Sequence, residues 1–126
     1  MKKILLVLFV CCITGLYSCD NYGDKIKISD HLEIYVQKDA TKEEAKNVGT
    51  YIDTTWKDLT QQKSFQLSKD SGIYFLKMVV NDSVKKDTTL DASFLIFKAL
   101  VQENALKGKP LTLIATDEYF KEIKRY

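Results

Sequence analysis

Cysteine is missing from the part of the chain that is expected to fold. The three cysteines, Cys11, Cys12 and Cys19, all stand within the first nineteen residues. The later residues therefore offer no thiol for a disulfide framework or for a thiolate zinc site. A domain of this size without disulfides is expected to rely on core packing alone.

Glycine and proline are also scarce, and no segment has a strongly biased composition. The 126 residues contain five glycines and one proline, and 45% of them are hydrophobic. This composition is typical of a folded protein and excludes a disordered chain. The length leaves room for one domain.

An excess of charge of one sign is absent from the folded part. The formal net charge is +2, and Lys2 and Lys3 at the N-terminus account for all of it. Residues 19–126 are therefore formally neutral and lack the basic stripe that phosphate-backbone binding requires. We expect no nucleic-acid partner.

Recognised motifs of catalysis and cofactor binding are missing as well. The chain has no nucleophile elbow, P-loop, dinucleotide-binding glycine pattern or EF-hand loop. His31 is the only histidine, and the ordinary interpretation is a surface residue at a strand edge. The close acidic pairs are Glu43 with Glu44, Asp53 with Asp58, and Asp117 with Glu118. Neighbouring residues such as Glu43 and Glu44 do not face each other on a helix. Because the motifs are missing as well, we predict no catalytic site, metal or cofactor.

The N-terminus has the features of an export signal. Lys2 and Lys3 precede an uninterrupted apolar run over residues 4–13. A membrane-spanning helix needs about 20 apolar residues, so this run has the length of a signal-peptide core instead. Residues 1–18 are predicted to be a signal peptide.

The residues that follow the apolar run indicate a lipid anchor. Leu16-Tyr17-Ser18-Cys19 resembles the lipobox of bacterial lipoproteins, although Tyr17 departs from the usual small or aliphatic residue. The resemblance implies diacylglycerol on the Cys19 sulfur, cleavage after Ser18 and acylation of the new amine. Two or more acyl chains hold a protein firmly at a membrane. The alternative is a secretory signal followed by an incidental cysteine.

Three segments divide the chain under this interpretation. Residues 1–18 are the signal peptide, residues 19–29 are the lipidated Cys19 and a short polar tether, and residues 30–126 are one domain. The protein is expected at a bacterial envelope membrane, with neither the membrane nor its side defined.

Hydrophobic periodicity predicts the elements of the domain. Alternation over residues 31–38 predicts a strand, and Thr41 and Glu44 form a capping box before a helix. That helix carries Ala45, Val48, Ile52, Trp56 and Leu59 at helical spacing. Residues 64–68 and 73–80 read as a hairpin around the glycine-containing turn 69–72.

The second half of the domain repeats the helix–strand order. A helix is predicted from residue 88 or 89 to about 107, with its main stripe on Leu90, Phe94, Phe97 and Val101, widened by Leu100 and Leu106. Gly108 and Pro110 end it, and residues 111–116 form a fourth strand. Residues 117–126 fit either a short helix or an edge strand.

The order β-α-β-β-α-β predicts an α+β two-layer sandwich. We expect a ferredoxin-like antiparallel four-stranded sheet with two helices on one face. Residues 65–70, 74–80 and 108–110 are similar to an uncharacterised βαββαβ domain of various bacterial proteins. That resemblance begins at about Glu33, and it implies no functional residue.

The sheet face without helices is the candidate interaction surface. It is expected to present Tyr35, Phe75, Val79 and Ile114, and exposed apolar patches often mark interaction sites. The C-terminal segment with Tyr119, Phe120 and Ile123 covers this face in the alternative interpretation. The leading hypothesis is a non-enzymatic lipoprotein that binds an envelope protein or itself.

Two other functions are kept open. A small-ligand or glycan-binding module would use Tyr35, Phe75 and Trp56 as stacking surfaces. An enzyme is the third option, and it would need His31 to meet a carboxylate in a polar pocket.

Overall fold

The computed structural model describes residues 21–56 and 62–126. The predicted signal peptide, the cleavage site at Ser18 and Cys19, and the helical position of Leu59 lie outside the described residues. Within the described residues, no helix is long and apolar enough to cross a membrane.

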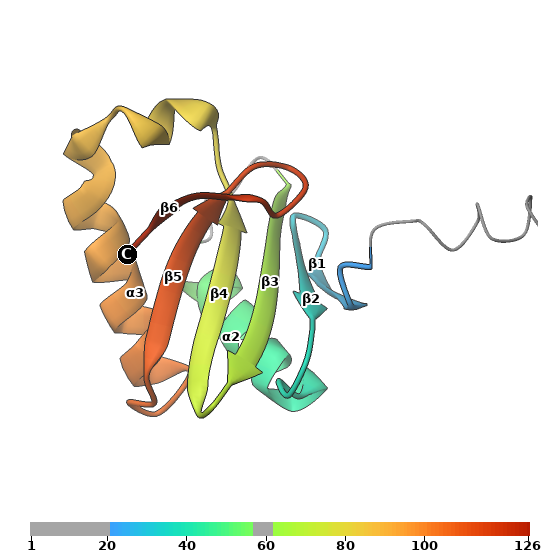
Figure 1. The fold of residues 1–126 in the computed structure, drawn as a ribbon. Coiled ribbons are helices and arrows are strands. Elements are labelled where there is room, and N and C mark those ends of the chain that lie inside the picture. Colours follow the sequence, from blue (N-terminus) through green and yellow to red (C-terminus); the bar gives the residue numbers. More distant parts are fainter. Residues whose placement is uncertain (1–20, 57–61) are drawn as a thin grey trace, which may run out of the picture.

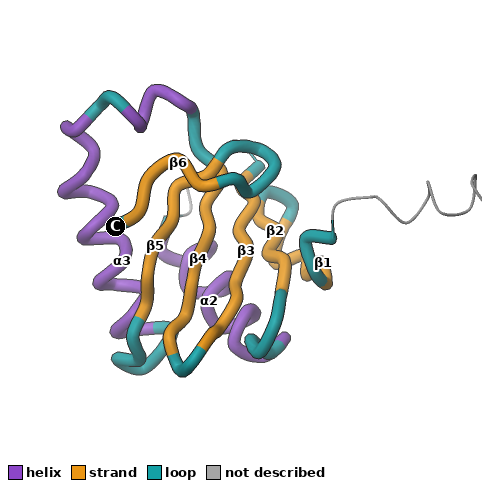
Figure 2. The backbone as a smooth tube through the Cα atoms, viewed as in Figure 1, coloured by secondary structure: helices purple, strands orange, loops and turns teal. Residues whose placement is uncertain are grey.

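The described residues form one mixed six-stranded sheet with helices against it (Figures 1 and 2). The strands follow the chain order across the sheet, from β1 at one edge to β6 at the other. The elements are β1 Asp24–Ser29, β2 Leu32–Val36, α2 Lys42–Thr55, β3 Lys63–Asp70, β4 Ile73–Val79, the 3₁₀ turns Asp82–Lys85 and Thr88–Leu90, α3 Asp91–Asn104, β5 Leu111–Thr116 and β6 Glu122–Arg125.

The α+β class agrees with the sequence, but the ferredoxin-like topology is wrong. Strands β2 and β3 are parallel neighbours, and so are β4 and β5, whereas the other three pairs are antiparallel. In a ferredoxin-like sheet each helical crossover skips a strand position, which leaves every neighbour antiparallel. Here each crossover returns to the adjacent position, and the sheet is therefore mixed.

Both ends of the sheet extend beyond the predicted four strands. Residues placed in the tether form β1, whose Ile26 and Ile28 pack against the core. The C-terminal segment contains the edge strand β6, so the helical alternative for these residues is not realised. Each added strand joins its neighbour as a local antiparallel hairpin.

The chain ahead of β1 is also fixed to the sheet. The Gln37 side chain donates a hydrogen bond of 2.6 Å to the carbonyl of Asn21. The Gln66 side chain donates one of 3.0 Å to the carbonyl of Tyr22. The polar segment that looked like a flexible tether is therefore ordered from Asn21 onward.

The core lies between the sheet and the helices. Alternate residues of β2, β3 and β4 point toward the helices, including Ile34, Leu67 and Leu76, which are fully buried. Helix α2 contacts β1 and β2, and α3 contacts β5, so the two helices cover opposite halves of one face (Figure 1). The capping box of Thr41 and Glu44 starts α2 as the sequence predicts.

Candidate functional site

The four residues predicted as an interaction surface do share the face without helices. Tyr35, Gln66, Lys77 and Ile114 are successive partners in one row across β2, β3, β4 and β5. Phe75 and Val79 follow the same alternation along β4 as Lys77. Ile114 is only 3% exposed, however, and the other three predicted residues are half-buried.

Two segments cover part of this face. The turn between β5 and β6 crosses the upper ends of β4 and β3 (Figure 1). Its Phe120 adopts a left-handed backbone with φ of 59°, and its ring contacts Tyr35 edge-on at 5.6 Å. The Tyr22 ring contacts both of these rings, with 5.8 Å between the ring centres of Tyr22 and Tyr35 and 5.2 Å between those of Tyr22 and Phe120. The three rings form a closed cluster, which fits the covered alternative better than an open surface.

A carboxylate on the same face is held by polar partners. Glu33 accepts a hydrogen bond of 2.8 Å from Ser64 and lies 2.9 Å from the Lys25 ammonium. Burial raises the pKa of the Glu33 carboxyl, but the hydrogen bonds from Lys25 and Ser64 lower it by a larger amount. The pKa of Glu33 therefore lies below the ordinary 4.5. Glu33 is therefore ionised at neutral pH and acts as a structural acceptor.

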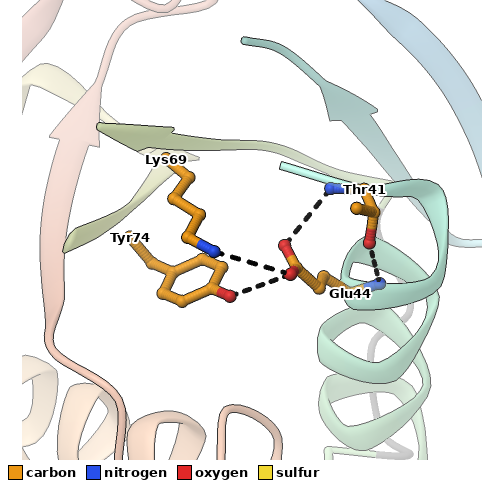
Figure 3. Close-up of polar contacts among 4 residues, drawn as sticks. All are labelled: Thr41, Glu44, Lys69 and Tyr74. Atoms are coloured by element: carbon orange, nitrogen blue, oxygen red, sulfur yellow. Dashed lines mark hydrogen bonds and ion pairs between the residues drawn. The ribbon is translucent and has the colours of Figure 1, made fainter. Parts of the chain in front are cut away.

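A second polar cluster lies where α2 begins (Figure 3). One oxygen of Glu44 accepts from the backbone of Thr41 at 3.2 Å, and the other accepts from the Tyr74 hydroxyl at 2.9 Å. The Lys69 ammonium lies 4.0 Å from the same carboxylate and 5.1 Å from the centre of the Tyr74 ring. Both carboxylate oxygens of Glu44 thus form contacts within the domain. The cluster joins helix to sheet and holds no free acid–base pair.

The other residues that were considered for catalysis lie far apart or already form hydrogen bonds within the fold. The backbone carbonyl of His31 accepts a hydrogen bond from the backbone N–H of Lys63, and His31 itself is exposed. Asp53 accepts from Ser29 at 2.8 Å, while Asp58 lies outside the described residues. Asp117 accepts from the backbone of Tyr119 and Lys121 and so shapes the last turn. No group of three His, Cys, Asp or Glu side chains in the described ranges could hold a metal ion.

An apolar cavity of about 350 Å³ lies on the helix side of the sheet. Its walls come from the end of α2, the start of β3, the end of β4 and the inner side of α3. Trp56 and Phe65 belong to this wall, and Phe97 contacts both, at 4.8 Å and 6.4 Å between ring centres. The sequence predicted Trp56 on the inner stripe of its helix, but periodicity does not predict a cavity that is formed by several separate elements.

Helix α3 carries an exposed apolar side that the sequence analysis overlooked. Phe94, Phe97, Val101 and Leu106 pack against the core as predicted, but Leu90 and Leu100, which the sequence also placed on this stripe, are 39% and 38% exposed. On the opposite side, Leu95 is 51% exposed and Ile96 is 61% exposed. Leu100 is also exposed, and Ala92 and Ala99 complete the exposed side. The spacing 92, 95, 96, 99 and 100 is a second helical periodicity, and it is the signal that would have revealed this surface.

A family model described as a family N-terminal domain, AF_1994_N, matches residues 25–125. No curated protein matches the chain, and no solved structure matches it. The matched range runs from the start of β1 to the end of β6 and so spans the whole described sheet.

Proposed function

The chain belongs to the AF_1994_N domain family, whose name indicates no activity, and we propose its function from its own residues. The protein is a lipid-anchored component of a bacterial envelope. Its domain is a non-enzymatic interaction module that pairs with a second copy through the exposed side of α3.

The sequence of the N-terminus supports the anchor. The apolar run 4–13 has the length of a signal-peptide core, and Leu16 and Ser18 precede Cys19 as in a lipobox. Cys19 stands only two residues before Asn21, the first residue of the described domain. An acyl group there would hold the whole domain against the membrane.

The exposed apolar side of α3 is the observation that carries the pairing. A surface helix is ordinarily apolar on one side, whereas a helix that is apolar all round is normally buried. Helix α3 has Leu95 and Ile96 more than half exposed opposite a packed inner stripe. A contiguous apolar surface of this kind marks an interaction site.

The order of residues along this side favours a second copy as the occupant. Two α3 helices related by a two-fold axis run antiparallel, so their surfaces must be self-complementary. Centring the axis between Ile96 and Ala99 pairs Ile96 with the partner's Ala99, and Leu95 with the partner's Leu100. The small alanine side chains allow a close approach opposite the bulky ones.

The helix dipole provides one further contact in this arrangement, at a first turn that also carries Asp91. Glu103 lies at the C-terminal end of the same side and falls opposite the first turn of the paired helix. A carboxylate is favoured there by the helix dipole. In α3 itself, the N-cap Leu90 provides no side-chain cap to that first turn.

A lipid surface is a poorer occupant of the α3 side. Helices that lie in a membrane interface carry lysine and arginine along their polar flanks. Helix α3 contains Lys98 as its one basic residue, together with Asp91 and Glu103. It also lies on the opposite side of the sheet from β1 (Figure 1). A pair formed through α3 therefore leaves β1 at the outer side of each copy.

Metabolic labelling with a palmitate analogue tests the anchor. The wild-type chain is expected to take up label, and Cys19→Ser is expected to take up none. Equal labelling of the two chains, or no labelling of the wild type, contradicts a lipid on Cys19.

Site-directed crosslinking in the membranes of expressing cells tests the pairing. Ala99→Cys is expected to form a disulfide-linked dimer on mild oxidation, because two copies place this position near the two-fold axis. Ser71→Cys, in the exposed β3–β4 turn, is the matched control and should remain monomeric. Adding Ile96→Glu to Ala99→Cys should abolish the crosslink while the circular dichroism spectrum is retained. Equal crosslinking of the two cysteine variants contradicts pairing through α3.

A further inference from the structure

The cavity between the two helices has the size and lining of a small-molecule site. Its volume of about 350 Å³ lies within the usual range of ligand pockets, about 300–1,000 Å³. Most of the wall is apolar, including Ile52, Met78 and the rings of Trp56, Phe65 and Phe94. An apolar wall of this kind selects a hydrocarbon group.

Few of the described residues of the wall are polar. Among them, Lys63 is the one charged residue. Lys63 lies on the same side of β3 as the buried Phe65, which follows it by two residues in the strand. No carboxylate of the described residues is within ion-pair distance of the Lys63 ammonium, whereas Lys69 in the same strand has Glu44.

Two uncharged polar residues complete the lining. Asn81 and Ser83 stand at the beginning of the 3₁₀ turn that follows β4. The Asn81 side-chain oxygen accepts from the Ser83 backbone at 3.1 Å, so it holds that turn in place. The Asn81 amide N–H groups and the Ser83 hydroxyl are donors on the same wall.

We propose that this cavity binds an aliphatic carboxylate, with the hydrocarbon chain among the aromatic rings and the carboxylate paired with Lys63. A ligand carboxylate would supply a counter-charge, since no carboxylate of the described residues pairs with Lys63, and a lysine bond to a carboxylate is about twice as strong as a neutral one. The volume corresponds to about twelve water-sized volumes of ~30 Å³, which suits a chain of roughly ten carbons. This site is separate from the exposed side of α3, and binding does not depend on pairing.

Trp56 reports directly on occupancy. It is the only tryptophan of the chain, and it lies in the cavity wall. Titrating the mature chain with decanoate below its micelle concentration is expected to change the Trp56 emission to saturation. Isothermal titration calorimetry gives the same affinity without relying on fluorescence.

Three probes of equal chain length separate charge from hydrophobic burial. Decanoate is expected to bind more tightly than decanol, and decylammonium more weakly than either. Lys63→Gln should weaken decanoate binding about tenfold, the loss of one charge-assisted hydrogen bond, and leave decanol binding unchanged. Lys77→Gln, on the opposite face of the adjacent strand, is the matched control and should bind decanoate as the wild type does.

Two results overturn the proposal. One is the absence of saturable decanoate binding by both fluorescence and calorimetry. The other is an equal decanoate affinity of Lys63→Gln and wild type, with both variants folded by circular dichroism.

Discussion

The hydroxyl of Tyr74 donates a 2.9 Å hydrogen bond to Glu44, which joins the buried start of β4 to the first turn of α2 (Figure 3). Tyr74 is fully buried, yet its polar atom reaches the one acidic residue that also caps the helix. A single carboxylate therefore connects two elements that are thirty residues apart in the chain.

Removing this hydroxyl should destabilise the domain without changing its fold. Tyr74→Phe is expected to cost about 1 kcal/mol, the typical net value of a buried hydrogen bond. Urea unfolding of the mature chain measures the loss. Tyr35→Phe is the control, since its hydroxyl lies 3.5 Å from Glu33 and contributes little. Equal losses in the two variants would show that the Glu44 contact has no special weight.

The capping role of Glu44 can be separated from its charge. Glu43 and Glu44 both lie in the first turn of α2, where a negative charge favours the helix. Neutralising either one removes that common benefit, but only Glu44→Gln alters the bonds to Thr41 and Tyr74 and the nearby charge of Lys69. Glu44→Gln should therefore lose more unfolding free energy than Glu43→Gln, by roughly 1 kcal/mol. Similar values for both would leave the helix dipole as the sole effect.

The contact between α2 and β1 leaves no room for a side chain at Gly49. A methyl group there would lie 2.6 Å from Cγ1 of Ile28. Gly49→Ala is expected to cost about 1–3 kcal/mol by overpacking, despite the better helix propensity of alanine. Adding Ile28→Ala should relieve the clash, so the double variant should lose less than the sum of the single variants. Thermal unfolding of all three checks this, and strict additivity would contradict a direct clash.

The stability of the domain should depend on pH through Glu33. Because the folded pKa of Glu33 is depressed below 4.5, its contribution is complete above that value and is lost as the pH falls through the folded pKa. Glu33→Gln should therefore be less stable than wild type at pH 7, by about 1 kcal/mol, and the difference should shrink in acid. Urea unfolding at neutral and acidic pH measures it, with the exposed Glu118→Gln as control. A difference independent of pH would exclude ionisation as the cause.

Sequence periodicity predicted the elements better than their arrangement. The capping box, the β3–β4 hairpin and the inner stripe of α3 depend on residues close together in the chain. The capping box is found where it was expected. The hairpin is found with a shorter turn, Ser71–Gly72, and the stripe is found without Leu90 and Leu100. Whether β2 pairs with β3 depends on where the chain returns to the sheet after α2, either beside β2 or one strand position away from it. Alternation of Ile34 or Phe65 is the same in either topology, so it could not decide between them.

The candidate sites were less predictable for the same reason. Phe120 covers Tyr35 only because a left-handed residue turns the chain back toward the sheet. The cavity needs Trp56, Phe65 and Phe97 from three elements to meet, and no local pattern encodes that meeting. The exposed side of α3 was readable in principle, but the inner stripe of the same helix gave the stronger pattern.

The hydrogen bond from Gln37 to Asn21 has a mechanical consequence for an acylated Cys19. Two Cα–Cα steps of about 3.8 Å separate the modified residue from a carbonyl already locked onto the fold. Acyl chains on Cys19 would therefore bring the β1 edge of the domain close to the bilayer surface.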